Sequence, residues 1–168
     1  GTTYSLTLQI LALMTVLTLL PSLVLMMTSF TRIIIVLSLL RQALGTAQTP
    51  PNQVLVGLAL FLTIFIMAPI FQNIYTNALV PYMNKDMQLD VALETAQRPV
   101  KDFMMNQTRQ QDISTFMRIA NLEDLQEPSD VPFTVLVPAF ITSELKSAFI
   151  IGFLIYIPFV VIDLVVAS

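Results

Sequence analysis

The hydrophobic and polar positions divide the chain into an apolar block, a polar block and a second apolar block. No charged residue precedes Arg32, whereas most of the charged residues fall between Lys85 and Asp130, and few follow. We therefore divide the chain into a first apolar helical hairpin at residues 1–75, a polar helical insertion at 76–132 and a second apolar helical block at 133–168.

The first apolar block is long enough for two membrane-spanning helices. The stretch from Leu6 to Leu40 would be about 52 Å long as one helix, whereas a bilayer core is about 30 Å thick. It therefore either overshoots the membrane or breaks near Pro21, whose ring removes a backbone hydrogen bond. After a loop at 45–52, residues 53–71 form a second apolar segment of spanning length.

The second apolar block predicts one more span. Thr142 or Ser143 is a suitable N-cap for a helix that carries Glu144 in its first turn, where a negative charge suits the helix dipole. Residues 147–168 then form the third apolar segment, with Pro158 inside it. The pattern as a whole predicts an all-α membrane protein with long, kinked apolar helices.

The polar block predicts short amphipathic helices. Its apolar residues recur at steps of three and four, at Leu89, Leu93, Ala96, Val100 and Phe103. We expect Pro99 to begin a new helix and Asp112 to be the N-cap of the next one, while 121–132 is loop-like. Phe103, Phe116 and Met117 lie on apolar faces. Packing inside the subunit is the simpler interpretation, and contact with a neighbouring copy is the alternative.

Composition excludes several classes of function. Charged residues make up 11% of the chain, whereas soluble proteins have about 25%. The net charge of −3 argues against nucleic-acid binding, and the absence of His and Cys removes the commonest metal ligands and general base. Ser143 and Lys146 match the S-x-x-K spacing of penicillin-binding proteins, but the other elements of that site are absent, so we interpret the match as chance. We predict no enzyme activity, no metal and no cofactor.

The charged residues inside the apolar blocks are the candidate functional residues, because a charge in a membrane interior normally has a partner or lines a cavity. Glu144 and Lys146 are two residues apart, so they point in different directions on a helix and do not pair. Asp163 lies about 25 Å from Lys146 along a helix and needs a partner from another segment or chain. We favour inter-helix or inter-subunit contacts for these residues, Arg32 and Arg41 over a proton or ion relay.

The charges also predict an orientation. The short loop after Arg41 carries no acidic residue, whereas the polar block is mainly acidic. Because basic loops remain in the cytoplasm, we expect residues 76–132 on the periplasmic side.

Five segments together resemble the FliP family of flagellar and virulence secretion proteins. They read MTSFTRIIIVL at 27–37, LRQALGT at 40–46, PPNQVLVGLALFLT at 50–63, TSELK at 142–146 and PFVVIDLV at 158–165. The resemblance covers essentially the whole chain.

The resemblance implies a pore-forming subunit of the export gate of the flagellar type III secretion system in the bacterial inner membrane, within the flagellum basal body. Several copies would form a helical ring with FliR and FliQ, through which unfolded flagellar proteins pass, and helices of spanning length would partly be covered by protein rather than lipid. Family chains also continue into a methionine-rich loop and a further apolar helix whose lysine would be a partner for Asp163. The alternatives are a virulence secretion homologue and a small-solute or proton transporter subunit.

Overall fold

The computed structural model describes residues 1–45, 48–122 and 130–168, and every long regular element in these ranges is a helix. The order is α1 (Thr2–Met26), α2 (Phe30–Ala43), α3 (Asn52–Ile74), the π-helical η1 (Tyr75–Leu79), α4 (Val80–Met83), α5 (Leu89–Gln107), α6 (Gln110–Ile119) and α7 (Phe133–Ala167). Three of the stretches, 2–26, 52–83 and 133–167, are long and apolar enough to cross a membrane. The predicted all-α membrane fold is confirmed.

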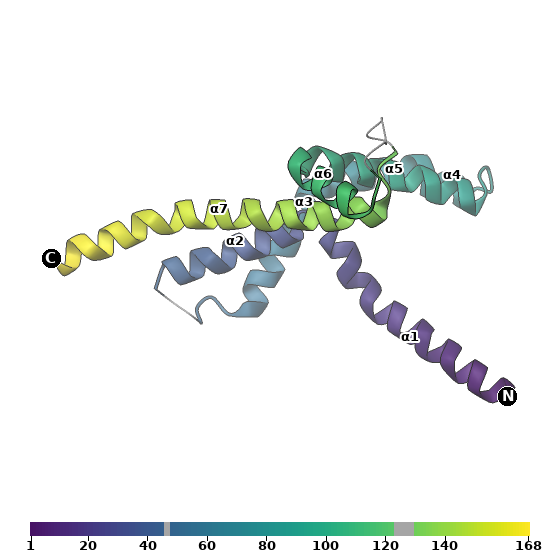
Figure 1. Cartoon of the computed structure of the whole chain (residues 1–168), viewed down its shortest axis with the longest axis horizontal. Coiled ribbons are helices and arrows are strands. Elements are labelled where there is room, and N and C mark those ends of the chain that lie inside the picture. Colours follow the sequence, from purple (N-terminus) through teal and green to yellow (C-terminus); the bar gives the residue numbers. More distant parts are fainter. Residues whose placement is uncertain (46–47, 123–129) are drawn as a thin grey trace.

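Helix α7 forms the long axis of the molecule (Figure 1). Helix α2 lies along α7, and α3 packs against α2 and α5. Helix α6 packs against the N-terminal half of α7, and α4 and α5 extend away from the N-terminal end of α7. Helix α1 diverges from this body and has no buried residue.

The first apolar block breaks at 27–29 and not near Pro21, which lies inside α1. The side chain of Thr28 explains the position of the break. Its hydroxyl donates to the carbonyl of Leu25 at 2.6 Å and accepts from the backbone N–H of Phe30 at 3.3 Å, so it replaces helical partners at this point.

Helix α5 is continuous through Pro99, so the predicted division at this residue is wrong. Ala92 and Met104, on either side of the proline, are both buried. Packing at both ends holds the two halves in line despite the missing hydrogen bond. The two leucines at the start of the helix are not buried, since Leu89 is 54% exposed and Leu93 is 62% exposed.

Two predicted N-caps are also wrong. Helix α6 begins at Gln110, with Arg109 at the N-cap position, so Asp112 lies inside its first turn. Helix α7 begins at Phe133, so Thr142 and Ser143 lie in its middle. Most of the loop predicted at 121–132 lies outside the described residues.

The hydrophobic core joins α5, α6 and the start of α7. Its buried members are Met104, Met117, Val131, Val135, Leu136 and Phe140. Those in α7 follow the spacing of one helix face, which explains why this helix begins ten residues before the polar residues expected to cap it.

Helices α2 and α7 pack closely because Gly152 has no side chain. A methyl group built on Gly152 would lie 2.2 Å from Leu39 Cδ1 and 3.1 Å from Leu39 Cβ. Rotation of the leucine relieves the first contact but not the second, so the glycine sets the distance between the helices.

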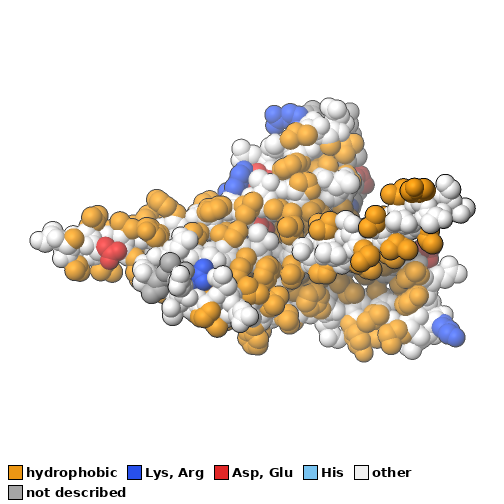
Figure 2. Space-filling model, turned by 90° about the horizontal axis from the view of Figure 1, so that it is seen from below, with side chains coloured by type: hydrophobic (Ala, Val, Ile, Leu, Met, Phe, Trp, Pro, Cys, Tyr) orange, Lys and Arg blue, Asp and Glu red, His pale blue; other side chains and the backbone are white. Residues whose placement is uncertain are grey.

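Apolar side chains cover much of the outer surface, including the narrow C-terminal part of α7 (Figure 2). Monomeric soluble proteins rarely expose such continuous apolar areas. This surface is suited to lipid or to other proteins.

We predict that Gly152→Leu destabilises the protein by about 1–3 kcal/mol, because the added atoms force α2 and α7 apart. Thermal unfolding of the detergent-solubilised protein, followed by circular dichroism, measures the change. Gly57→Leu is the matched control, because nothing lies within 4 Å of that position in α3. Equal melting temperatures for the two variants would contradict the close crossing.

Candidate functional site

A short polar segment in the middle of α7, residues 143–147, is the point where three helices meet. The residues before and after it in α7 are mainly apolar. Its side chains contact α2 on one side and α6 on the other. We call this stretch the α7 polar segment.

Glu144 connects α7 to α2. The Nη2 atom of Arg32 donates to Glu144 Oε1 at 2.6 Å, and the two side chains are 30% and 2% exposed. A buried carboxylate without a partner is strongly destabilising, so this ion pair ties the two helices together across 112 residues of sequence.

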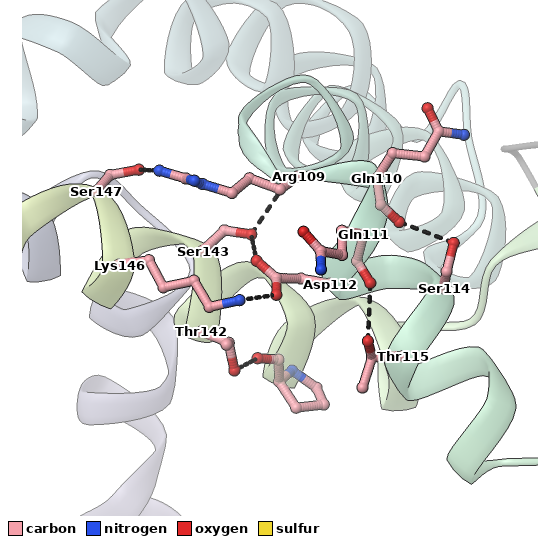
Figure 3. A network of polar contacts seen from close by, with 11 residues as sticks. Arg109, Gln110, Gln111, Asp112, Ser114, Thr115, Thr142, Ser143, Lys146 and Ser147 are labelled. Carbon is pink, nitrogen blue, oxygen red and sulfur yellow. Dashed lines mark hydrogen bonds and ion pairs between the residues drawn. The ribbon is translucent and has the colours of Figure 1, made fainter. Parts of the chain in front are cut away.

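Lys146 and Ser143 connect α7 to α6 (Figure 3). The Nζ atom of Lys146 donates to Asp112 Oδ1 at 2.5 Å, and the Ser143 hydroxyl donates to Asp112 Oδ2 at 2.7 Å. Ser143 is fully buried and Asp112 is 3% exposed. Both oxygens of the buried carboxylate therefore have a partner on α7.

Arg109 extends the same network. Its backbone N–H donates to the Ser143 hydroxyl at 2.9 Å, and its Nη2 atom donates to the Ser147 hydroxyl at 3.4 Å (Figure 3). The Ser143 hydroxyl thus donates to Asp112 and accepts from the N-terminal end of α6. A single buried hydroxyl fixes both the position and the direction of that helix.

The network controls the charge state of Asp112. Burial raises the pKa of its carboxyl, but the hydrogen bonds from Lys146 and Ser143 and the charges of Lys146 and Arg109 together outweigh burial. The net result is a pKa below the ordinary value of 3.8. The Asp112 carboxyl is therefore ionised at neutral pH, with Lys146 and Ser143 as its partners.

The S-x-x-K spacing at Ser143 and Lys146 has a structural explanation. Residues three apart on a helix share one face, and both side chains reach the same carboxylate. The serine proton is directed at Asp112 and not at the lysine. The pattern serves as a two-point carboxylate contact. Its partners Asp112 and Arg109 were not among the charged contact residues predicted from the sequence.

Arg41 and Asp163 lie away from the α7 polar segment. The Nη1 atom of Arg41 donates to Asn52 Oδ1 at 2.7 Å and to the carbonyl of Pro50 at 3.2 Å, which ties the end of α2 to the start of α3. Asp163 is exposed near the C-terminal end of α7. Within the part of the chain that the structure describes, no hydrogen bond or ion pair involves its carboxylate.

The three interface candidates lie at the core. The ring of Phe103 packs against the buried Phe140 ring at a tilt of 58° with a centroid distance of 6.0 Å, and Phe116 is partly buried against the same cluster. Met117 is 8% exposed in this chain. Their contact with a neighbouring copy stays a prediction.

The described residues contain no group of three or more His, Cys, Asp or Glu side chains that could hold a metal ion. The two buried carboxylates among these residues, Glu144 and Asp112, each have a cationic partner. The arrangement is therefore suited to holding helices together.

We predict that Glu144→Gln destabilises the protein by about 1–3 kcal/mol, because Arg32 would keep its charge without a counter-ion. The value lies below that of a fully buried pair because the arginine is part-exposed. Melting of the detergent-solubilised protein measures the loss. Glu94→Gln removes a carboxylate from the exposed Glu94–Arg98 pair, at 3.4 Å, and should have little effect.

A second prediction concerns pH. The pKa of Asp112 is lowered on folding, so the stability that it contributes is fully present well above 3.8 and is lost only as the pH falls through the lower pKa of the folded state. Asp112→Asn should thus destabilise the protein by about 1–3 kcal/mol, and equally from about pH 5 to pH 8. The exposed Asp102→Asn is the control. If the loss of stability in Asp112→Asn were smaller near pH 5 than near pH 8, Asp112 would titrate in this range, which would contradict the prediction.

Comparison with known proteins identifies the family. The FliP family matches residues 13–168. Three relatives named "Flagellar biosynthetic protein FliP" come from Pectobacterium carotovorum subsp. carotovorum, Cereibacter sphaeroides and Bacillus subtilis, with identities of 55%, 57% and 52%. The matches cover 100%, 100% and 96% of this chain but 65%, 56% and 73% of the relatives, so the chain spans roughly half to three quarters of their length. On this evidence the chain belongs to the FliP family.

Proposed function

We propose that the chain is part of a pore-forming subunit of the flagellar export gate, which passes unfolded flagellar proteins across the inner membrane. The observation that carries the proposal is the similarity, over the whole chain, to proteins named for flagellar biosynthesis. We extend this function to the chain because the five segments that resemble the FliP family all lie within residues 13–168, which match that family. Most of the three apolar stretches that could cross a membrane lies within the same residues.

The proposed subunit works as a homo-oligomer of several copies, together with FliR and FliQ. Exposed apolar residues outside the candidate spans support this arrangement, since lipid does not cover them. Leu89 and Leu93 on α5 and Ile119 on α6, which is 70% exposed, are examples. Leu89 and Leu93 are four residues apart and so lie together on α5, and exposed apolar patches of this kind are typical of contacts between proteins.

Phe103, Phe116 and Met117 are the proposed contact residues. The two phenylalanines pack inside the subunit but keep part of their surface accessible, so they border the area that a neighbour would cover. A neighbouring protomer would thereby rest on the same core that orders α5, α6 and α7.

The proposed location is the inner membrane at the flagellum basal body. Residues 1–75 and 133–168 form the apolar units, and residues 76–132 lie on the periplasmic side. The acid-free loop after Arg41 supports the cytoplasmic placement of the opposite end. Lipid and protein share the surface of the apolar units.

We predict that the detergent-extracted protein has the mass of an assembly with several copies, measured by native mass spectrometry. Asp163→Ala should lower the yield of this assembly more than it changes proton conductance in liposomes, because an exposed carboxylate on an apolar helix needs a counter-ion from another chain. A solitary monomer, or a normal assembly that has lost proton flux, would contradict the proposal.

A complementation experiment separates the flagellar machine from a virulence one. We expect the protein to restore motility when it is expressed in a flagellar deletion strain.

A further inference from the structure

Four uncharged polar side chains form a stripe on the helix that runs from α3 through η1. They are Gln72, Asn73, Thr76 and Asn77, and all four are exposed. Gln72 and Thr76 are four residues apart, as are Asn73 and Asn77, so the set forms two neighbouring rows along the helix. We call this set the amide stripe.

The amide stripe is held in place by its own hydrogen bonds. Gln72 Nε2 donates to the Thr76 hydroxyl at 3.3 Å, and Asn77 Nδ2 donates to Asn73 Oδ1 at 2.9 Å. An amide has two donors and a two-fold acceptor, so each of the three amide side chains keeps groups to spare. All four side chains are exposed, while the η1 part of the helix packs on α5.

Two further features surround the stripe. Residues 75–79 are π-helical, a rare irregularity that is frequent at functional sites. A shallow hollow of about 530 Å³ lies beside it, lined in part by Phe71, Tyr75 and Leu79. Hydrogen-bonding groups and a place for an apolar side chain are thus adjacent.

We propose that the amide stripe binds an extended polypeptide segment, which deepens the proposed export function and rests on it. Four residues of an α-helix rise about 6 Å, and the π-helical residues from Tyr75 onward make the spacing between Asn73 and Asn77 slightly shorter than this. Peptide groups that face one side of an extended chain repeat every two residues, about 6.6 Å apart. A chain lying along the helix therefore presents its backbone groups in near register with the stripe.

Hydrogen-bonding capacity favours an extended polypeptide over lipid or a helix of a second copy as the occupant of the amide stripe. Lipid tails would leave the amides unpaired. A helix of a second copy has its backbone groups satisfied internally, so it would offer only side chains. An unfolded segment has free N–H and C=O groups that need both donors and acceptors. Because the stripe carries no charge, it accepts chains of different sequence.

Photocrosslinking tests the proposal. A benzophenone amino acid replaces Asn73 or Asn77 in the assembled gate, in cells that make an exported flagellar subunit fused to a tightly folded domain that stalls it. We expect crosslinks to the stalled subunit at both positions, several-fold above those from position 97. Gln97 is the matched control, an exposed amide on α5 outside the stripe.

The leucine variants Asn73→Leu and Asn77→Leu give an independent readout. They should slow export several-fold while the amount of assembled gate is unchanged, whereas Gln97→Leu should have no effect. Crosslinks from the stripe to another copy of the chain or to lipid, or loss of assembly in the leucine variants, would overturn the stripe as a polypeptide site.

The two proposals fail differently. If the stalled subunit crosslinks to other exposed positions, such as Phe65 or Phe153, but not to the stripe, only the stripe is ruled out. If it crosslinks to no position of the chain, the export function itself is contradicted.

Discussion

Two carboxylates are buried where three helices meet, and the rest of the structure depends on how they are neutralised. Glu144 is paired with Arg32 of α2, and Asp112 of α6 is paired with Lys146 of α7. Because a buried carboxylate that loses its partner destabilises the fold, by about 1–3 kcal/mol where the cation is part-exposed, each pair favours one arrangement of its helices. Neither α2 nor α6 can leave α7 without exposing a charge to an apolar surface.

Two kinds of contact, one apolar and one polar, hold the helices together. The core of α5, α6 and α7 is apolar and non-directional, with Phe140 and Leu136 fully buried. The polar contacts at residues 143–147 are directional and set which way α6 and α2 approach. Gly152 then sets how closely α2 approaches, because any side chain there would meet Leu39. Apolar burial supplies stability, and the charges and the glycine supply geometry.

The molecule combines this small interior with a large, mainly apolar outer surface. Helix α1 has no buried residue, and α5 leaves Leu89 and Leu93 of its first turns exposed. A chain that orders its interior with two ion pairs yet exposes so much apolar surface is suited to an environment of lipid and neighbouring proteins. The amide stripe differs from this surface, because its groups need hydrogen-bonding partners that lipid tails do not provide.

Local helix signals in the sequence predicted where helices occur but misplaced several of their ends. The predicted helix at 53–71 lies within α3, whereas α5 continues past Pro99 and α7 begins well before Ser143. At each of these points tertiary packing outweighed a local preference of about 1–3 kcal/mol. Asp112 illustrates the reason, since the carboxylate that could have served as a cap is buried instead against Lys146 and Ser143 of α7.

The sequence by itself determined the all-helical class, the apolar and polar blocks and the family, because these depend on composition, periodicity and contiguous motifs. It also determined that Glu144 and Lys146 point apart, since helix geometry alone requires this. Only the tertiary structure decided their partners. Arg32 lies 112 residues from Glu144 and Asp112 lies 34 from Lys146, and no local pattern encodes a contact between charges so far apart along the chain.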